Sequence, residues 1–129
     1  FRPVVLRSAV ADFSQHGWPV TGSIDGNLST GWGIHPQQGR QATAIYEVAA
    51  DIDYKTGTRL RFTLVFNFGS AHTLGRFRVA ATTHPRPLPT NAGLSGEKWQ
   101  EIQGKINGAL DRAVAFLMTR ATSCPVYKL

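Results

Sequence analysis

Hydrophobic and polar residues alternate along several short runs in the first two thirds of the chain. The clearest run is TRLRFTLVF, residues 58–66; similar runs cover residues 74–83 and 42–50, and a weaker one is RPVVLRSA near the N-terminus. In the first run, alternate apolar positions share one face, namely Leu60, Phe62, Leu64 and Phe66. A period of two is typical of strands with one buried face, and the glycine-rich turns between the runs favour antiparallel pairing. The pattern predicts a mainly β fold, an antiparallel β-sandwich.

The periodicity changes after THPRPLPTNAG, residues 83–93, where three prolines interrupt any regular ladder. Beyond this stretch, apolar residues recur at three- and four-residue spacing: Trp99, Ile102, Ile106, Leu110, Val114 and Leu117. The spacing predicts one C-terminal amphipathic helix over residues 95–120. Gly104 and Gly108 each cost about 1 kcal/mol relative to alanine, so the helix should depend on docking its apolar stripe.

These patterns divide the chain into four parts. We expect a β-sandwich domain over residues 1–84, a proline-rich connector over 85–94, a docking helix over 95–120 and a tail over 121–129. A length of 129 residues with 42% hydrophobic content fits one soluble domain with a modest core. No apolar run approaches the roughly 18 residues of a membrane span, so we expect no transmembrane segment. The start at Phe1 favours a piece of a longer protein.

Net charge indicates the class of partner, and the cysteine count limits how the fold can be stabilised. The 14 Lys and Arg residues outnumber the 8 Asp and Glu residues, and the net charge of +6 favours acidic partners such as sulfated or uronic glycans. Nucleic acid is not expected, because no recognised binding motif accompanies the charge. Cys124 is the only cysteine, so packing rather than an internal disulfide must stabilise the fold.

Catalysis has little support in the sequence. The four histidines stand at no metal-protease spacing, and no serine lies in a nucleophile elbow. Glycoside hydrolysis needs two carboxylates that flank the scissile bond, and the strand region holds few acids. We therefore expect a protein that is not an enzyme.

The loop SIDGNLSTGW, residues 23–32, combines oxygen-bearing side chains with two glycines. One interpretation is a tight turn, in which Asp25 accepts backbone hydrogen bonds and Gly26 takes a positive φ. The other is a calcium site, because calcium prefers about six to eight oxygen ligands and Asp, Asn and Thr oxygens can converge in such a turn. The spacing of an EF-hand is absent. Local sequence favours the turn.

Two blocks carry a family resemblance: ADFSQHGWPVTGSIDGNLSTGWGIHPQQGRQATAIYEVA, residues 11–49, and GTRLRFTLVFNFGSAHTLGRFRVAATT, residues 57–83. The first has an apolar residue before Asp-Gly-Asn and then Thr-x-Trp, and the second contains HTLGRFRVAAT. The chain resembles the discoidin or coagulation factor 5/8 type C group of galactose-binding-like domains. Within that group it most resembles the version in planctomycete surface proteins that also carry cytochrome c-like segments.

The resemblance implies a jelly-roll β-sandwich whose loops at one end bind glycans, often with a structural calcium ion near the Asp-Gly-Asn turn. Carried over residue by residue, it implies that Asp25, Asn27 and Thr30 are calcium ligands and that Trp32 is a buried anchor beneath the loop. It also implies an extracytoplasmic location within a larger protein.

Physical reasoning adds sugar-binding candidates in the loops beside this turn. A sugar needs an aromatic face for its C–H groups, and charged or amide groups that bond to its hydroxyls. The loops supply such side chains in Trp18, His35, Gln37, Gln38 and Arg40. The alternative is that Trp18 packs against the sandwich edge while the other residues form a solvated loop.

Four arginines form a second candidate for binding. If runs 58–66 and 74–83 pair as a hairpin, a basic stripe projects from its non-core face: Arg59, Arg61, Arg76 and Arg78. Such a stripe suits an anion. The alternatives are a solvated face, or pairing with Glu47 or Asp53.

Two functions follow from these observations. The first is a non-catalytic carbohydrate-binding module that tethers a larger extracytoplasmic protein to polysaccharide or glycan. The alternative is a structural or protein-interaction module that binds no sugar and docks to a neighbouring domain through the helix over residues 95–120.

Overall fold

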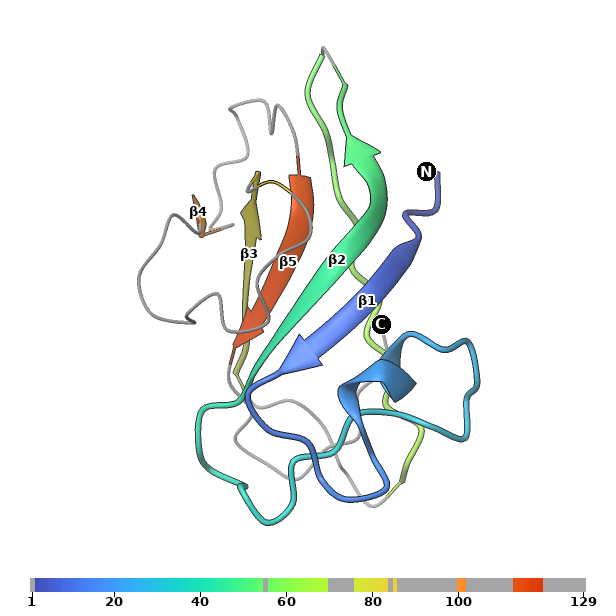
Figure 1. The fold of residues 1–129 in the computed structure, drawn as a ribbon, viewed down its shortest axis with the longest axis vertical. Coiled ribbons are helices and arrows are strands. Elements are labelled where there is room, and N and C mark those ends of the chain that lie inside the picture. The colour runs from blue at the N-terminus through green and yellow to red at the C-terminus, as the bar shows by residue number, and fades with distance from the viewer. Residues whose placement is uncertain are drawn as a thin grey trace.

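The computed structural model describes residues 2–54, 56–69, 76–83, 85, 100–101 and 113–119. Its strands form one antiparallel sheet in the order β1-β2-β5-β3-β4 (Figure 1). In chain order, the elements are β1 (Leu6–Ala11), the 3₁₀ helix η1 (Val20–Ser23), β2 (Thr43–Ile52), β3 (Arg78–Thr82), β4 (Gln100–Glu101) and β5 (Ala113–Thr119). The predicted mainly β fold with antiparallel strands is confirmed. No helix in this part of the chain is long and apolar enough to cross a membrane.

β2 is the longest of these strands and lies between β1 and β5. Tyr46 pairs with Ala9 of β1 and with Phe116 of β5. Residues 43–48 are all buried, so both faces of β2 are covered. The sequence TAIYEV suits this position, because β-branched and aromatic residues pack well on a pleated surface. The predicted strand over residues 42–50 is confirmed as β2, and the weaker N-terminal run contributes β1.

The hydrophobic core lies on the face of the sheet that carries Tyr46. Its main cluster comes from β1, β2 and the connection between them: Ala9, Val20, Trp32, Ile34, Ala42, Ala44 and Tyr46. A second cluster joins Val48 and Ile52 to Ala81 of β3. Segment 56–69 runs behind β2 and β1 in Figure 1, and its apolar side chains pack against both clusters. This segment therefore covers part of the core face.

Residues 58–66 show the predicted alternation over most of the run but do not belong to the sheet. Half-buried Leu60, Phe62 and Leu64 alternate with exposed Arg59, Arg61 and Thr63. The alternation ends there, because Val65 is half-buried and Phe66, which was predicted on the buried face, is exposed. The hydrogen-bonded neighbours of β3 are β5 on one side and β4 on the other. The predicted hairpin between 58–66 and 74–83 is therefore wrong. The strand predicted over 74–83 is confirmed for Arg78–Thr82, and residues 70–75 lie outside the described residues.

β5 corrects the predicted C-terminal helix. Residues 100–101 and 113–119 are strands, and the other residues of the predicted helix over 95–120 lie outside the described residues. The sequence AVAFLMT is an unbroken apolar run, which suits a central strand as well as a helix. In the sheet it forms ladders with both β2 and β3, whereas Gly104 and Gly108 weaken the helical alternative. Apart from Pro85, the predicted connector and tail are also outside the described residues.

Candidate functional site

The long connection between β1 and β2, residues 12–42, gathers at one end of the sheet (Figure 1). Segment 56–69 reaches the same place, because the side-chain amide of Asn67 donates a hydrogen bond to the carbonyl of Leu28 at 2.6 Å. We call residues 12–42 together with residues 66–69 the loop end. It holds most of the side chains that the sequence offers for sugar binding.

Backbone hydrogen bonds fix the position of Trp18. Gln15 N donates to the Gly33 carbonyl at 2.8 Å, and Gly33 N donates to the Trp18 carbonyl at 3.1 Å. Trp18 N closes the turn by donating to the Gln15 carbonyl at 2.9 Å. A Cβ at position 33 would lie 2.7 Å from Gln15 Oε1 and 3.0 Å from Trp18 Cβ, so the approach requires glycine. We call Gln15, Trp18 and Gly33 the backbone frame.

The indole of Trp18 meets the ring of Phe68 edge to face. Their centroids lie 5.1 Å apart, and the ring planes make an angle of 86°. Such pairs contribute about 0.5–1.5 kcal/mol beyond the burial of area. Trp18 is half-buried and Phe68 is 50% exposed, so the pair presents aromatic surface to solvent. The ring of Trp18 therefore packs on Phe68 and stays accessible to solvent, and its role in sugar binding stays a prediction.

Gln15 also connects the backbone frame to the polar candidates. Its Oε1 accepts a hydrogen bond from His35 N at 3.2 Å. Gln38 Nε2 lies 2.5 Å from His35 Nδ1. An amide nitrogen can only donate, so Nδ1 accepts and the imidazole proton lies on Nε2. His35 and Gln38 therefore form a fixed pair with the imidazole N–H left to face a ligand or water.

Two turns complete this loop. Gln37 N donates to the Ile34 carbonyl at 2.6 Å, and Arg40 N donates to the Gln37 carbonyl at 3.1 Å. The peptide bond between His35 and Pro36 is cis. Through these bonds the structure joins the predicted loop candidates into one connected unit: Trp18, His35, Gln37, Gln38 and Arg40.

Two arginines of the predicted basic stripe lie at the loop end. In the sheet register, Arg78 pairs with Thr119 of β5, which pairs with Thr43 of β2. Arg78 is therefore level with the start of β2, two strand spacings or about 10 Å away. Arg76 precedes it, and both side chains are exposed.

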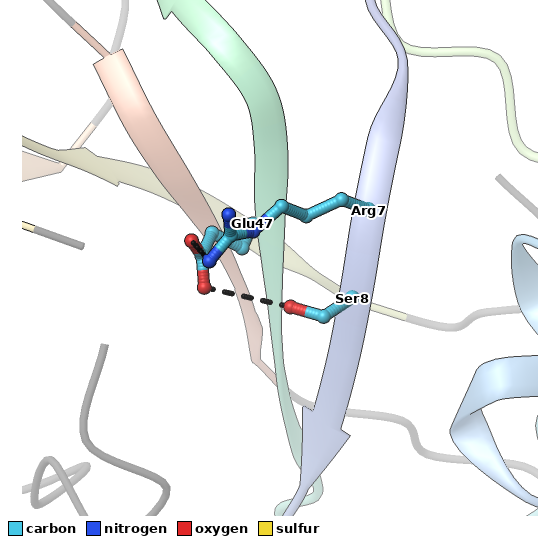
Figure 2. A network of polar contacts seen from close by, with 3 residues as sticks. All are labelled: Arg7, Ser8 and Glu47. Atoms are coloured by element: carbon cyan, nitrogen blue, oxygen red, sulfur yellow. Dashed lines mark hydrogen bonds and ion pairs between the residues drawn. The ribbon is translucent and has the colours of Figure 1, made fainter. Parts of the chain in front are cut away.

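The other two arginines lie at the opposite end of the sheet. Arg59 and Arg61 line a cavity together with Ile52, the last residue of β2. The single four-arginine stripe is therefore wrong, because it required a hairpin that the sheet does not contain. One acid considered as a partner for the stripe is also engaged elsewhere. Figure 2 shows Glu47 beside Arg7, whose Nη2 lies 2.6 Å from Glu47 Oε1.

The Asp-Gly-Asn turn is closed by its own hydrogen bonds. Asp25 Oδ1 accepts from Asn27 N at 2.8 Å, and Asn27 Oδ1 accepts from Ser29 N at 3.0 Å. Gly26 has a φ of +78°, a conformation that glycine adopts without steric cost. These are the features of the predicted tight turn, which is confirmed.

Oxygen atoms also converge at this turn. The Thr30 hydroxyl lies 2.5 Å from Asp25 Oδ2 and 2.8 Å from the Asn27 carbonyl oxygen. Among the described residues, no three His, Cys, Asp or Glu side chains gather as a metal site. A cation at the turn would thus meet one carboxylate and otherwise neutral oxygens. All of these donors are of the oxygen type that calcium prefers.

Buried polar side chains anchor the base of the loop end. Trp32 is 3% exposed, as expected of an anchor, and its Nε1 donates to the Phe13 carbonyl at 2.9 Å. Tyr46 of β2 bonds to Ser23 of η1 through their hydroxyls. Burial raises the pKa of Tyr46 to about 12, and the bond to Ser23 lowers it in part. The loops therefore stand on a packed and hydrogen-bonded base.

Sequence reasoning missed two residues of this site, Gln15 and Phe68. Gln15 acts through one side-chain amide and backbone atoms, and no motif marks such a role. Phe68 gives a weak signal, because it is an aromatic residue beside Gly69 after the alternating run has ended.

Comparison with known proteins leaves the family open. No protein-family model, curated protein or solved structure matches the chain. The resemblance to the discoidin group therefore stays a prediction.

Proposed function

We propose that the protein is a non-catalytic carbohydrate-binding module that binds polysaccharide or glycan at the loop end. One observation carries the proposal. The backbone frame holds the Trp18–Phe68 aromatic pair and the His35–Gln38 polar pair in one hydrogen-bonded unit.

A sugar ring suits this arrangement chemically. The apolar C–H groups of a sugar pack on aromatic surface, while its hydroxyls need directional donors and acceptors. The imidazole Nε2–H of His35 supplies a donor, and Gln37 and Gln38 supply amides. Because hydrogen bonds already hold the backbone of this loop and the His35–Gln38 pair, less side-chain entropy is lost when a ligand binds.

Arginines extend the proposal to anionic glycans. Arg40 lies in the same loop, and Arg76 and Arg78 stand at the same end of the sheet. Guanidinium groups bind carboxylates and sulfates through paired hydrogen bonds. The net charge of +6 also favours the approach of an acidic polymer. Sulfated and uronic polysaccharides are therefore the preferred class.

We infer a discoidin-like jelly-roll sandwich as the finer description of the fold, and an extracytoplasmic location within a larger protein. The resemblance of residues 11–49 and 57–83 supports both inferences. The packing of Leu60, Phe62 and Leu64 over the core face also supports the sandwich, because a second layer would place apolar side chains there.

A structural calcium ion is part of the proposal. Asp25, Asn27 and Thr30 would hold it, and the bound ion would neutralise the Asp25 carboxylate and stabilise the turn. With one carboxylate the expected dissociation constant is on the order of 10⁻⁴–10⁻³ M, as in extracellular modules. Thermal melting with millimolar calcium should show a higher Tm than melting with a chelator, and the difference should vanish in Asp25→Asn. Equal Tm values in the wild type would contradict the site.

Affinity electrophoresis through gels with embedded polysaccharides tests the sugar proposal. Neutral and uronic or sulfated polymers should each be compared with a gel that lacks polymer. We expect retardation of the wild type, and about tenfold weaker retardation of Trp18→Ala, because the aromatic platform is lost. Tyr54→Ala is the matched control, since Tyr54 is an exposed aromatic residue in the connection after β2, outside the loop end. No retardation of the wild type by any polymer would overturn the proposal.

The role of charge needs its own comparison. Arg40→Gln should weaken retardation by anionic polymers more than by neutral ones, because only the anionic polymers offer a partner for the guanidinium. Arg59→Gln removes the same charge at the opposite end of the sheet and should change neither. Equal effects of the two substitutions would show that net charge, and not the loop end, attracts the polymer.

The alternative function depended on a continuous helix over residues 95–120. Residues 113–119 form β5 between β2 and β3, so they are not available as a docking helix. The geometry of the loop end favours carbohydrate binding, and that is the function that we propose.

A further inference from the structure

A cavity of about 480 Å³ lies at the end of the sheet opposite the loop end. Its walls come from the N-terminal residues 2–6, the last part of β2 and residues 58–63. These three stretches meet at the upper end of the view in Figure 1, where the chain begins and where β2 ends. A volume of this size suits a small molecule, since ligand pockets commonly span about 300–1,000 Å³.

The walls of the cavity are largely apolar. The side chains that form them include Leu6, Ile52, Leu60 and Phe62, with Tyr46 among the lining residues. Leu60 and Phe62 also belong to the packed face of segment 56–69. Such walls exclude water from a ligand and offer few partners to sugar hydroxyls. The site therefore differs in chemistry from the one at the loop end.

Three exposed arginines line the same cavity: Arg2, Arg59 and Arg61. Within the described part of the chain, neither Arg2 nor Arg59 forms an ion pair with a carboxylate. The guanidinium group presents its donors in a planar fork that matches a carboxylate, sulfate or sulfonate. Charge at this cavity thus selects a negative ligand.

We propose that this cavity binds a small organic anion, a carboxylate or sulfonate carried on an apolar body. The anionic group lies with Arg2 and Arg59, and the apolar body lies against Leu60 and Phe62. This site is separate from the proposed carbohydrate site and does not depend on it.

Octanoate and 8-anilinonaphthalene-1-sulfonate are suitable probes for the full chain. The sulfonate should become fluorescent on binding, and octanoate should displace it. Heptyltrimethylammonium has the same seven-carbon tail and the opposite charge, so it should displace the dye at least tenfold less effectively. Equal displacement by the two amphiphiles would overturn the proposal, because the arginines would then have no role.

Substitutions locate the site. The double variant Arg2→Gln/Arg59→Gln should bind octanoate at least tenfold more weakly than the wild type does. The double variant Arg76→Gln/Arg78→Gln removes the same charge at the loop end and should bind octanoate as the wild type does. Unchanged octanoate binding by Arg2→Gln/Arg59→Gln would contradict the assignment.

Leu60→Trp tests the cavity itself, because the larger ring should occupy it and abolish octanoate binding. An unchanged far-UV circular dichroism spectrum would show that this variant is folded. If Leu60→Trp does not fold, the smaller Leu60→Phe replaces it. Undiminished octanoate binding by a folded variant at this position would place the ligand elsewhere.

Discussion

The hydroxyl of Tyr46 donates a hydrogen bond to the hydroxyl of Ser23 across 3.1 Å, where both side chains are fully buried. The direction follows from the neighbouring bond, because Ser23 uses its only proton on the Val20 carbonyl at 2.6 Å. Ser23 belongs to η1 and Tyr46 to β2. This hydrogen bond therefore connects η1, at the base of the loop end, to β2, the longest described strand of the sheet.

Loss of this contact should destabilise the fold modestly. Tyr46→Phe removes one neutral buried hydrogen bond, so we expect the free energy of unfolding to fall by about 1 kcal/mol. Urea denaturation followed by tryptophan fluorescence measures the change. Tyr54→Phe is the control, since Tyr54 is 48% exposed and its substitution should change stability by less than about 0.5 kcal/mol. If Tyr46→Phe and the wild type were equally stable, this hydrogen bond would not contribute to the stability of the fold.

The same phenol should make stability fall at alkaline pH. The pKa of Tyr46 rises from 10.0 to about 12 on folding because burial disfavours the phenolate. Between these values the folded protein binds more protons than the unfolded chain, so the contribution is complete below pH 10 and is lost as pH rises toward 12. The loss should reach about 2 kcal/mol at pH 12. Urea denaturation over this range should show Tyr46→Phe overtaking the wild type, and a constant difference between them would contradict the prediction.

Arg7 should matter because Glu47 is buried. Glu47 is 5% exposed, its Oε1 lies 2.6 Å from Arg7 Nη2, and its Oε2 accepts a 3.5 Å bond from Ser8 Oγ (Figure 2). Arg7→Gln leaves a buried carboxylate without a cation, so we expect a loss of about 2–4 kcal/mol. The double variant Arg7→Gln/Glu47→Gln removes that charge and should recover most of the loss, which chemical denaturation can measure. Additive effects of the two substitutions would show that the pair is not coupled.

The sequence predicted the strands best where local pattern and surroundings agree. The first part of β2, residues 43–48, is buried on both faces, and most of its residues are apolar or β-branched. The alternation in residues 58–66 correctly predicted that Leu60, Phe62 and Leu64 face the core, but Phe66, predicted on the same face, is exposed. It could not predict the neighbours of that segment, because a period of two reports one buried face and not the identity of the adjacent strand. The hairpin and the four-arginine stripe were wrong for this reason.

The C-terminal prediction failed because the deciding contacts are distant in sequence. Val114 and Leu117 fit a helical stripe, but the whole run from Ala113 to Met118 is apolar and also fits a strand. Pairing of Thr119 with Thr43 and Arg78 settles the choice, and no local spacing reveals it. The hydrogen-bonded pairing of β5 with β2 and β3 therefore overrides the helical spacing of the local sequence.

The local parts of the site were predictable, and the parts built from backbone were not. The Asx hydrogen bonds of Asp25 and the burial of Trp32 follow from short sequence signatures. The frame of Gln15, Trp18 and Gly33 is made mainly of backbone N–H and carbonyl groups. Such groups are present at almost every residue, so the sequence does not mark where they will meet.

Gly33 leaves no room for a side chain between Gln15 and Trp18. A Cβ would lie 2.7 Å from Gln15 Oε1, which can move, and 3.0 Å from Trp18 Cβ, which is attached to the backbone. We expect Gly33→Ala to lower the free energy of unfolding by about 1–3 kcal/mol and to weaken polysaccharide retardation as Trp18→Ala does. Gly39→Ala is the matched control, because its Cβ would meet nothing within 4 Å and its φ of +76° costs only about 1–2 kcal/mol. If Gly33→Ala were retarded as strongly as the wild type, the position of Trp18 would not determine binding.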